Sequence, residues 1–177
     1  MYEGFWVGDQ GVGKVRIFYN DGHVYEGEWS GNKPHGQGRM TNPVGDVYVG
    51  PFVNGARSGR GAVTISTGEK YEGDFKNDAF DGEGTMTWKD GRQYTGSWKN
   101  SKIHGRGSYT WADGRKYVGD YNMEVKEGYG EFYWPDGKVF KGNWVAGKQE
   151  GKGEFIEPSG TVRKGEWAAG KVVRWDA

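Results

Sequence analysis

Two residue types are missing from this 177-residue chain, which contains no cysteine and no leucine. The lack of cysteine excludes a disulfide framework and a thiolate metal site. The lack of leucine disfavours an ordinary helical core, in which leucine is a preferred residue. No apolar run approaches the roughly 20 residues that a membrane-spanning helix requires. These absences favour a β-rich fold that is stabilised by neither disulfides nor a thiolate-bound metal.

Net charge is also lacking, because 24 basic and 24 acidic residues cancel. General nucleic-acid binders and proteins of anionic membrane surfaces rely on surplus positive charge, so a nucleic-acid partner is not expected. Hydrophobic residues make up only 34% of the chain, yet aromatic residues reach 16%. Disordered chains are poor in aromatic residues. The composition therefore predicts a folded protein whose core is aromatic.

A period of 23 residues runs through the whole chain without insertion or deletion. We number each repeat from its first aromatic residue, position 0, which recurs as Tyr2, Tyr25, Tyr48, Tyr71, Tyr94, Tyr117 and Phe140. Position 4 is always aromatic, and positions 2, 11, 13 and 20 are glycine with few exceptions. The sequence predicts a single array over residues 1–177. It has seven full repeats, starting at 2, 25, 48, 71, 94, 117 and 140, and a part-repeat over 163–177.

Each repeat predicts one β-hairpin. Residues 71–76 alternate between aromatic or glycine and charged side chains, which is the pattern of a strand with one solvated face. We expect a loop over 77–82, a second strand over 84–88, and an Asp-Gly turn at 90–91. Hairpins stacked side by side cover each other's aromatic residues. The expected fold is all-β: an elongated, twisted, single-layer antiparallel meander about 70 Å long, whose aromatic face forms a groove.

Tryptophans at position 17 should line up along this groove. They are Trp88, Trp111 and Trp134, and the groove would also include Tyr94, Trp98, Tyr117 and Tyr121. One interpretation is that these rings only form the core. The other is that part of the stripe stays open as a partner site, since exposed apolar patches mark such sites.

No motif predicts catalysis or a cofactor. The carboxylates recur at repeat positions, and none forms the paired arrangement in distinct environments that acid–base chemistry needs. His35 and His104 occupy position 10 of repeats three periods apart, which places them roughly 29 Å apart by strand spacing. They cannot share a metal within one chain, and they are only weak candidates for a zinc site between two chains. The chain is therefore predicted not to be an enzyme.

Several segments resemble a known family. YEGEW at 25–29, YEGDF at 71–75, HGQG at 35–38, HGRG at 104–107, DGEG at 81–84 and PDG at 135–137 are similar to MORN repeats. The resemblance implies the hairpin array, and it implies a role as in the protist cytoskeletal scaffolds that are built almost wholly of such repeats. Other MORN repeats occur in junctional membrane proteins and beside lipid kinase or methyltransferase domains. We expect that the array continues before Met1 and that Ala177 is its natural end.

The leading functional hypothesis is a non-enzymatic scaffold that self-associates. The last part-repeat lacks a following hairpin to cover its aromatic residues, and twofold pairs are the commonest assembly. An antiparallel homodimer would then form through Trp144, Phe155, Trp167 and Trp175. The resemblance implies a location in the cytoplasm, associated with the cytoskeleton or a membrane.

Two alternatives stay open. The first is an adaptor whose groove binds a peptide or helix of a cytoskeletal or coiled-coil partner. The second is a module that binds phospholipid headgroups, a phosphoinositide above all, as the name of the family proposes. The repeat over 94–116 has five basic residues and one acidic residue. Its headgroup site would comprise Lys99, Lys102, Arg106, Arg115 and Lys116.

Overall fold

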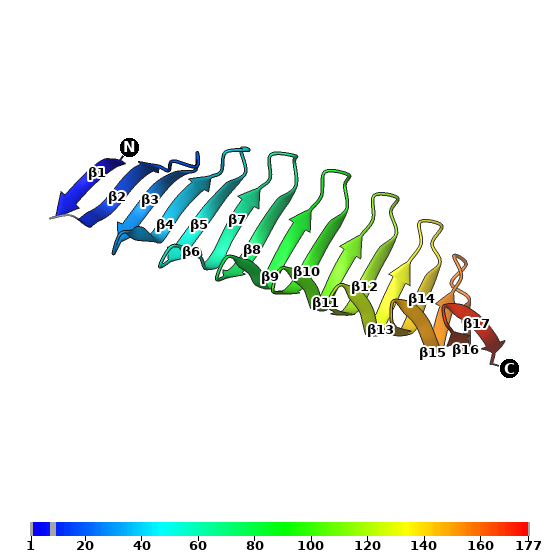
Figure 1. The fold of residues 1–177 in the computed structure, drawn as a ribbon. Coiled ribbons are helices and arrows are strands. Elements are labelled where there is room, and N and C mark those ends of the chain that lie inside the picture. The colour runs from blue at the N-terminus through cyan, green and yellow to red at the C-terminus, as the bar shows by residue number, and fades with distance from the viewer. Residues whose placement is uncertain (1, 8–9, 177) are drawn as a thin grey trace. The chain divides into compact units, whose positions relative to one another are not determined.

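The computed structural model describes residues 2–7 and 10–176, with side chains described from residue 13 onward. This part of the chain holds strands and turns but no helix, and hence no helical segment that could cross a membrane. The contacts divide the chain into two compact units, residues 1–89 and 90–177. In each unit the strands follow one another in chain order, and each pairs with the next, except that β6 and β7 both pair with β5 (Figure 1). The predicted all-β antiparallel meander is confirmed.

Strands β1 to β9 form the first unit. Their bounds are β1 Tyr2–Val7, β2 Gln10–Phe18, β3 Val24–Ser30, β4 Lys33–Thr41, β5 Val47–Val53, β6 Ala56–Arg57, β7 Gly59–Thr64, β8 Lys70–Lys76 and β9 Ala79–Thr87. The second unit runs from β10 to β17. Its strands are β10 Gln93–Lys99, β11 Lys102–Thr110, β12 Lys116–Asn122, β13 Val125–Tyr133, β14 Val139–Val145, β15 Lys148–Ile156, β16 Val162–Ala168 and β17 Lys171–Trp175. β5 pairs with both β6 and β7, because the second strand of that hairpin is interrupted at Ser58.

From the repeat that starts at residue 25 onward, the hairpin within each repeat closes through a turn of two residues. In the fourth repeat these are Asn77 and Asp78, whose φ angles are +47° and +69°. Two successive positive φ angles give a turn whose twist matches that of the flanking strands. The expected loop over 77–82 is therefore wrong, because β9 already begins at Ala79. Gly82, with φ of +118°, belongs to an irregularity inside the strand, where the register shifts between Gly73 and Phe75.

The connection between repeats is the longer turn that the Asp-Gly pairs predict. At 111–115 the Trp111 N–H donates to the Arg115 carbonyl at 2.8 Å, and the Gly114 N–H donates to the Trp111 carbonyl at 3.0 Å. The Asp113 carboxylate accepts the Arg115 backbone N–H at 3.1 Å. The turn thus satisfies its own polar groups, and it returns the chain in register for the next strand.

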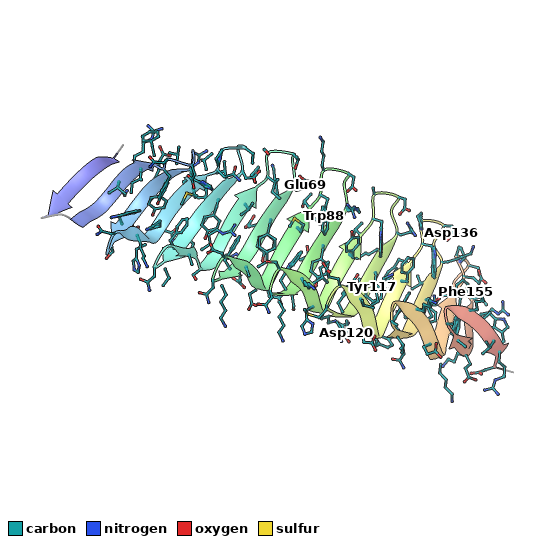
Figure 2. All side chains as sticks on the ribbon, viewed as in Figure 1. Glu69, Trp88, Tyr117, Asp120, Asp136 and Phe155 are labelled. Atoms are coloured by element: carbon teal, nitrogen blue, oxygen red, sulfur yellow. The ribbon has the colours of Figure 1, made fainter. Side chains whose placement is uncertain are left out.

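The tyrosine at position 0 explains the glycine columns. Tyr117 is completely buried, and its ring lies over Gly119 and Gly130, which face each other across β12 and β13. A methyl group on either glycine would overlap the ring. The Tyr117 hydroxyl donates to the Asp120 carbonyl at 3.1 Å, beside the register shift between Gly119 and Tyr121. The tyrosine ring therefore covers two glycines, and its hydroxyl gives a hydrogen bond to the backbone carbonyl at the register shift. Tyr117 and Asp120 are labelled in Figure 2.

The same arrangement recurs in both units. The hydroxyls of Tyr25, Tyr48, Tyr71 and Tyr94 donate to the carbonyls of Glu28, Pro51, Asp74 and Ser97. Within each unit, a position 0 ring meets the position 4 ring of its own repeat and that of the next repeat of the same unit, as for Tyr25, Tyr48, Tyr94, Tyr117 and Phe140. Tyr117 contacts Tyr121 and Trp144 edge to face, with ring centroids 5.1 and 5.2 Å apart. A ladder of edge-to-face rings, which is a favourable aromatic geometry, therefore forms the core of each unit.

Candidate functional site

The face that carries positions 0, 4, 9, 15 and 17 is called here the aromatic face, and the face with positions 1, 3, 12 and 14 the opposite face. On the aromatic face the predicted groove residues divide into two groups. Tyr94, Trp98, Tyr117 and Tyr121 are buried. Trp88, Trp111 and Trp134 are half-buried. The buried residues build the core, whereas the position 17 tryptophans stay partly open to solvent.

The open tryptophans of the second unit are linked through aromatic residues at position 15. The Trp111 and Phe132 ring centroids lie 5.6 Å apart, and those of Phe132 and Trp134 lie 4.6 Å apart. Trp134 in turn meets Phe155 at 6.1 Å. This chain of rings gives the second unit a continuous aromatic stripe. Phe155 is labelled in Figure 2.

A hollow of about 340 Å³ lies beside Trp111, and we call it the unit 2 hollow. It is lined by Ile103, Tyr109, Trp111, Tyr121, Val125 and Lys126. Glu124 and Gly147 also line it. Apolar walls with few polar groups are the usual composition of a ligand-binding cavity.

Lys126, at position 9, is the residue of this site that the sequence analysis missed. Its ammonium lies over the rings of Trp111, Tyr117, Phe132 and Trp144, at 4.9, 5.1, 4.8 and 4.8 Å from their centroids. Burial, and to a smaller extent the charge of Arg115, lower the pKa of Lys126 to about 8. The signal was a lysine at a position that faces the aromatic side, but the loop expected over 77–82 corresponds to residues 123–128 in this repeat and includes Lys126.

The first unit has a related hollow of about 470 Å³, called here the unit 1 hollow. Arg57, also at position 9, lines it together with Tyr48, Asp78 and Phe80. The Arg57 guanidinium lies 5.6 Å from the centroid of Tyr48 and donates from Nε to Asp78 Oδ1 at 3.1 Å. This cation therefore has a carboxylate partner inside its own unit.

The residues predicted for a dimer interface lie in different surroundings. Trp144 and Trp167 are buried, each 5% exposed, and the Trp144 indole N–H donates to the Gly130 carbonyl at 3.2 Å. Phe155 and Trp175 are half-buried, and the Arg163 guanidinium lies 3.8 Å from the centroid of the Trp175 ring. Only the latter two rings have surface left to offer a second chain.

β17 is the last described strand of the second unit. Among the described strands it pairs only with β16. Its Val172 and Val173 are 41% and 60% exposed. An edge strand with open backbone groups is a template for pairing with another strand.

The five predicted headgroup residues are all exposed but do not form one cluster. Lys99 and Lys102 face each other at the two-residue turn of their hairpin, whereas Lys116 begins β12 at the other end. About 20 Å separates the two ends by the rise of the strand. Arg115 is paired with Asp113 at 2.7 Å, and Arg106 lies 4.0 Å from Asp120.

The histidines have structural positions. His104 Nδ1 accepts the backbone N–H of Met123 at 3.4 Å, and so reaches the two-residue turn of the next repeat. Glu127 makes the same contact to Ala146 at 3.1 Å. His35 is exposed. Within the described residues no group of three or more His, Asp or Glu side chains is arranged to hold a metal ion.

Comparison with solved structures shows where this fold occurs. The TCP domain of Drosophila melanogaster SAS-4, solved in complex with a proline-rich motif of Ana2, is 14% identical, with a TM-score of 0.56 over 87% of this chain and 84% of that one. The TCP10c domain of Drosophila melanogaster Sas-4 is also 14% identical, with a TM-score of 0.52 over 95% and 100%. At this identity the likeness concerns the fold alone.

Sequence comparison identifies the repeats themselves. No curated protein sequence matches the chain significantly. The MORN-repeat family model, in contrast, matches residues 25–47, 71–91, 94–114, 117–139 and 140–162, which is well over half of the chain. The repeat that starts at 48 and the part-repeat from 163 form hairpins of the same kind in the structure. The chain therefore belongs to the MORN-repeat family.

Proposed function

We propose that this protein is a non-enzymatic interaction scaffold that binds a segment of a partner protein on the aromatic face of its second unit. The observation that carries the proposal is the half-buried Trp111, which lines the unit 2 hollow and continues through Phe132 to the half-buried Trp134. Tryptophan and tyrosine dominate the energetics of protein interfaces, because they bury much area and lose little conformational freedom. The described rings at positions 0 and 4, in contrast, are buried.

A related fold offers independent support. The SAS-4 TCP domain was solved in complex with a proline-rich motif of Ana2, so an antiparallel sheet of similar fold can serve as a platform for a peptide. Extended segments suit an aromatic-lined surface, because their side chains enter successive pockets. By inference, a partner segment would run across neighbouring repeats of the second unit. The proposed location is the cytoplasm, beside the cytoskeleton or a membrane, which imaging of the tagged protein would test.

The test is selection of peptides from a displayed library of random twelve-residue sequences. Trp111→Ala and Trp134→Ala should each weaken the selected peptides about tenfold or more, the loss typical of an interface hot spot. Tyr129→Ala is the matched control, because Tyr129 is 46% exposed and lies on the opposite face, across from Asn143. Binding that survives both tryptophan changes would refute the proposal.

Self-association is a second candidate function, favoured by the exposed Val172 and Val173 of β17. Two copies of β17 paired antiparallel would extend the sheet through a twofold axis and cover Val172, Val173, Phe155 and Trp175. Trp144 and Trp167 are buried within the unit, so they would stabilise the fold of this region without contacting the second copy. Light scattering coupled to size exclusion tests this: a dimer that dissociates in Val173→Lys supports it, and a monomer at high micromolar concentration excludes it.

A phosphoinositide remains an alternative partner. Basic side chains at both ends of β10 and β11 could each meet a headgroup, but they would have to do so separately. Co-sedimentation with vesicles that contain phosphatidylinositol bisphosphate at moderate salt would favour this alternative. A protein that stays in the supernatant would exclude it.

A further inference from the structure

We propose that the partner segment bound at the unit 2 hollow carries an acidic side chain, whose carboxylate pairs with Lys126. This inference rests on the proposed function and specifies the chemistry of the ligand. It is derived from a comparison of the two hollows, which lie three repeats apart in the sequence and differ in one decisive residue.

The two hollows place a cation at the same position of the repeat. Arg57 and Lys126 are both at position 9, and each lies over the ring of the tyrosine at position 0. In the unit 1 hollow the next repeat supplies a counter-ion at position 7, Asp78. Its carboxylate accepts from Arg57 Nε at 3.1 Å and from the Arg57 backbone N–H at 3.0 Å. In the unit 2 hollow the residue at that position is Gly147.

The backbone around the missing carboxylate is otherwise the same. The Asp78 N–H donates to the Arg57 carbonyl at 3.0 Å, and the Gly147 N–H donates to the Lys126 carbonyl at 3.0 Å. The space is also free, because a methyl group added at Gly147 would meet only Val125 Cγ1, at 3.9 Å. The second unit therefore keeps the backbone arrangement of this turn, has a lysine in place of the arginine, and lacks the anion.

No carboxylate of the described residues pairs with the Lys126 ammonium, so an anion from a partner could bind it. Within the described residues, Lys126 forms no ion pair. Glu124 lines the same hollow without approaching Lys126 to ion-pair distance, and Arg115 adds positive charge. A half-buried ammonium held only against aromatic rings gives up hydration without gaining a carboxylate. An incoming carboxylate would restore this interaction.

The remaining lining points to a protein segment as the source of the carboxylate. Ile103, Tyr109, Trp111 and Val125 offer apolar contacts around a single ammonium. Phosphate groups, by comparison, are typically bound by several donors or by bidentate arginine. An aspartate or glutamate with apolar neighbours, in an extended segment of a partner protein, matches both the single cation and the apolar walls.

The experiment uses the full chain and the peptides selected from the random library, synthesised with acetylated and amidated ends so that every carboxylate is a side chain. Exchange of the acidic residue for its amide should weaken binding to the wild-type protein about tenfold, as expected for a hydrogen bond to a charged group. The same exchange should change binding to Lys126→Gln no more than about twofold.

Two variants at position 147 provide the matched control. Gly147→Asp restores the internal counter-ion of the unit 1 hollow and should weaken the acidic peptide about tenfold. Gly147→Asn has the same shape without the charge and should keep the wild-type affinity within about twofold. Both residue types tolerate the positive φ of this turn, and Asp78 adopts it at +69°. Circular dichroism and thermal unfolding verify that both variants fold.

The outcomes separate this inference from the proposed function. Suppose that Trp111→Ala weakens binding of the selected peptides, but exchange of their acidic residue for its amide does not. This result would overturn the inference about the acidic side chain and leave the proposed function standing. Equal affinity of the acidic peptide for Gly147→Asp and Gly147→Asn would have the same meaning. A library without binders, or binders indifferent to Trp111→Ala, overturns both proposals. A dimer that dissociates in Gly147→Asp would identify a second copy of this chain as the occupant, and would overturn the assignment to a partner protein.

Discussion

At the residue scale, one hydroxyl links the aromatic core to the irregular point of each hairpin. Tyr117 donates to the Asp120 carbonyl, whereas Phe140, at the same position of the next repeat, has no hydroxyl to donate. Tyr117→Phe should lower the free energy of unfolding by about 1 kcal/mol, because a buried carbonyl loses its partner. Urea unfolding measures this change. Phe140→Tyr is the converse variant and should be neutral or stabilising; equal destabilisation by both changes would show that ring packing, and not the hydrogen bond, is decisive.

The glycine at position 13 is required for a different reason from the glycine at position 20. A Cβ at Gly130 would lie 2.5 Å from Tyr117 Cζ, whereas a Cβ at Gly160 would meet nothing within 4 Å. Gly160 instead has a φ of +85°. Gly130→Ala should cost about 3 kcal/mol or more, from overpacking and displacement of the tyrosine, and Gly160→Ala only about 1 kcal/mol, from backbone strain. Thermal unfolding of both variants compares the two costs, and similar losses would contradict this account.

Lys126 predicts a pH dependence of stability. Its pKa is about 8 in the folded protein and near 10.5 when unfolded, so between these values the unfolded chain binds more protons. The free energy of unfolding should therefore rise from pH 8 to about 10, above which ionising tyrosines oppose it, since burial raises the pKa of Tyr117 and Tyr121. Lys126→Met should abolish this rise.

The control for the pH measurement is provided by the other titratable and charged groups near position 126, which Lys126→Met leaves unchanged. Tyr109, Tyr117, Tyr121, Glu124 and Arg115 face Lys126 from the surrounding strands and turns, and all remain in Lys126→Met. Urea unfolding at intervals between pH 7 and 10 compares the two proteins. An equal slope in both would assign the rise to those groups and not to Lys126.

At the element scale, the two-residue turns differ in how well their residues suit them. From the repeat that starts at residue 25 onward, position 6 has a φ between +47° and +58°, with asparagine at 54, 77 and 100 but alanine at 146 and 169. Asparagine tolerates the left-handed region, whereas alanine is strained there. Ala146→Asn should stabilise the protein by about 0.5 to 1 kcal/mol, and Asn100→Ala should destabilise it by a similar amount. Thermal unfolding gives both signs, and a stabilising Asn100→Ala would contradict the strain argument.

The hairpins themselves could be predicted from the sequence because alternation, glycine columns and Asp-Gly turns all report local geometry. The error over 77–82 arose where geometry is set across the sheet. Gly82 looks like a loop residue, but it bends a strand whose register shifts opposite Asp74, and Asp74 Oδ2 accepts the Glu83 N–H at 2.9 Å. Lys126 was missed for the same reason: once position 9 was read as loop, nothing in the sequence placed it over four aromatic rings.

At the scale of the whole molecule, repetition separates what every repeat must have from what each repeat can vary. Positions 0, 2, 4 and 13 build the ladder and are nearly constant. From the second repeat onward, position 9 varies freely, and its residues are Pro34, Arg57, Phe80, Ile103, Lys126, Gln149 and Val172. These side chains lie on the aromatic face. The core positions are therefore nearly constant from repeat to repeat, whereas the surface of the aromatic face varies at position 9. The sequence shows this variation directly, but only the structure shows which face it occupies.

The number of acidic segments that one molecule binds should follow from position 7. The wild-type chain has one cation at position 9 with an internal counter-ion, Arg57 with Asp78, and one without, Lys126. Asp78→Gly removes that counter-ion from a residue that already has positive φ, and should open a second site in the unit 1 hollow. Titration calorimetry with the selected acidic peptide should then give two peptides per chain in place of one.

The second site should be the weaker one, because its walls are poorer in aromatic residues. The counterparts of Trp111 and Trp134 in the unit 1 hollow are Asn42 and Ile65. Asp78→Asn is the control, since it keeps a side chain in the space and removes only the charge. It should also release Arg57, although an amide can still accept its hydrogen bond, so its second site should bind less tightly than that of Asp78→Gly. A stoichiometry of one in both variants would mean that the aromatic wall, and not the free cation, decides where an acidic segment binds.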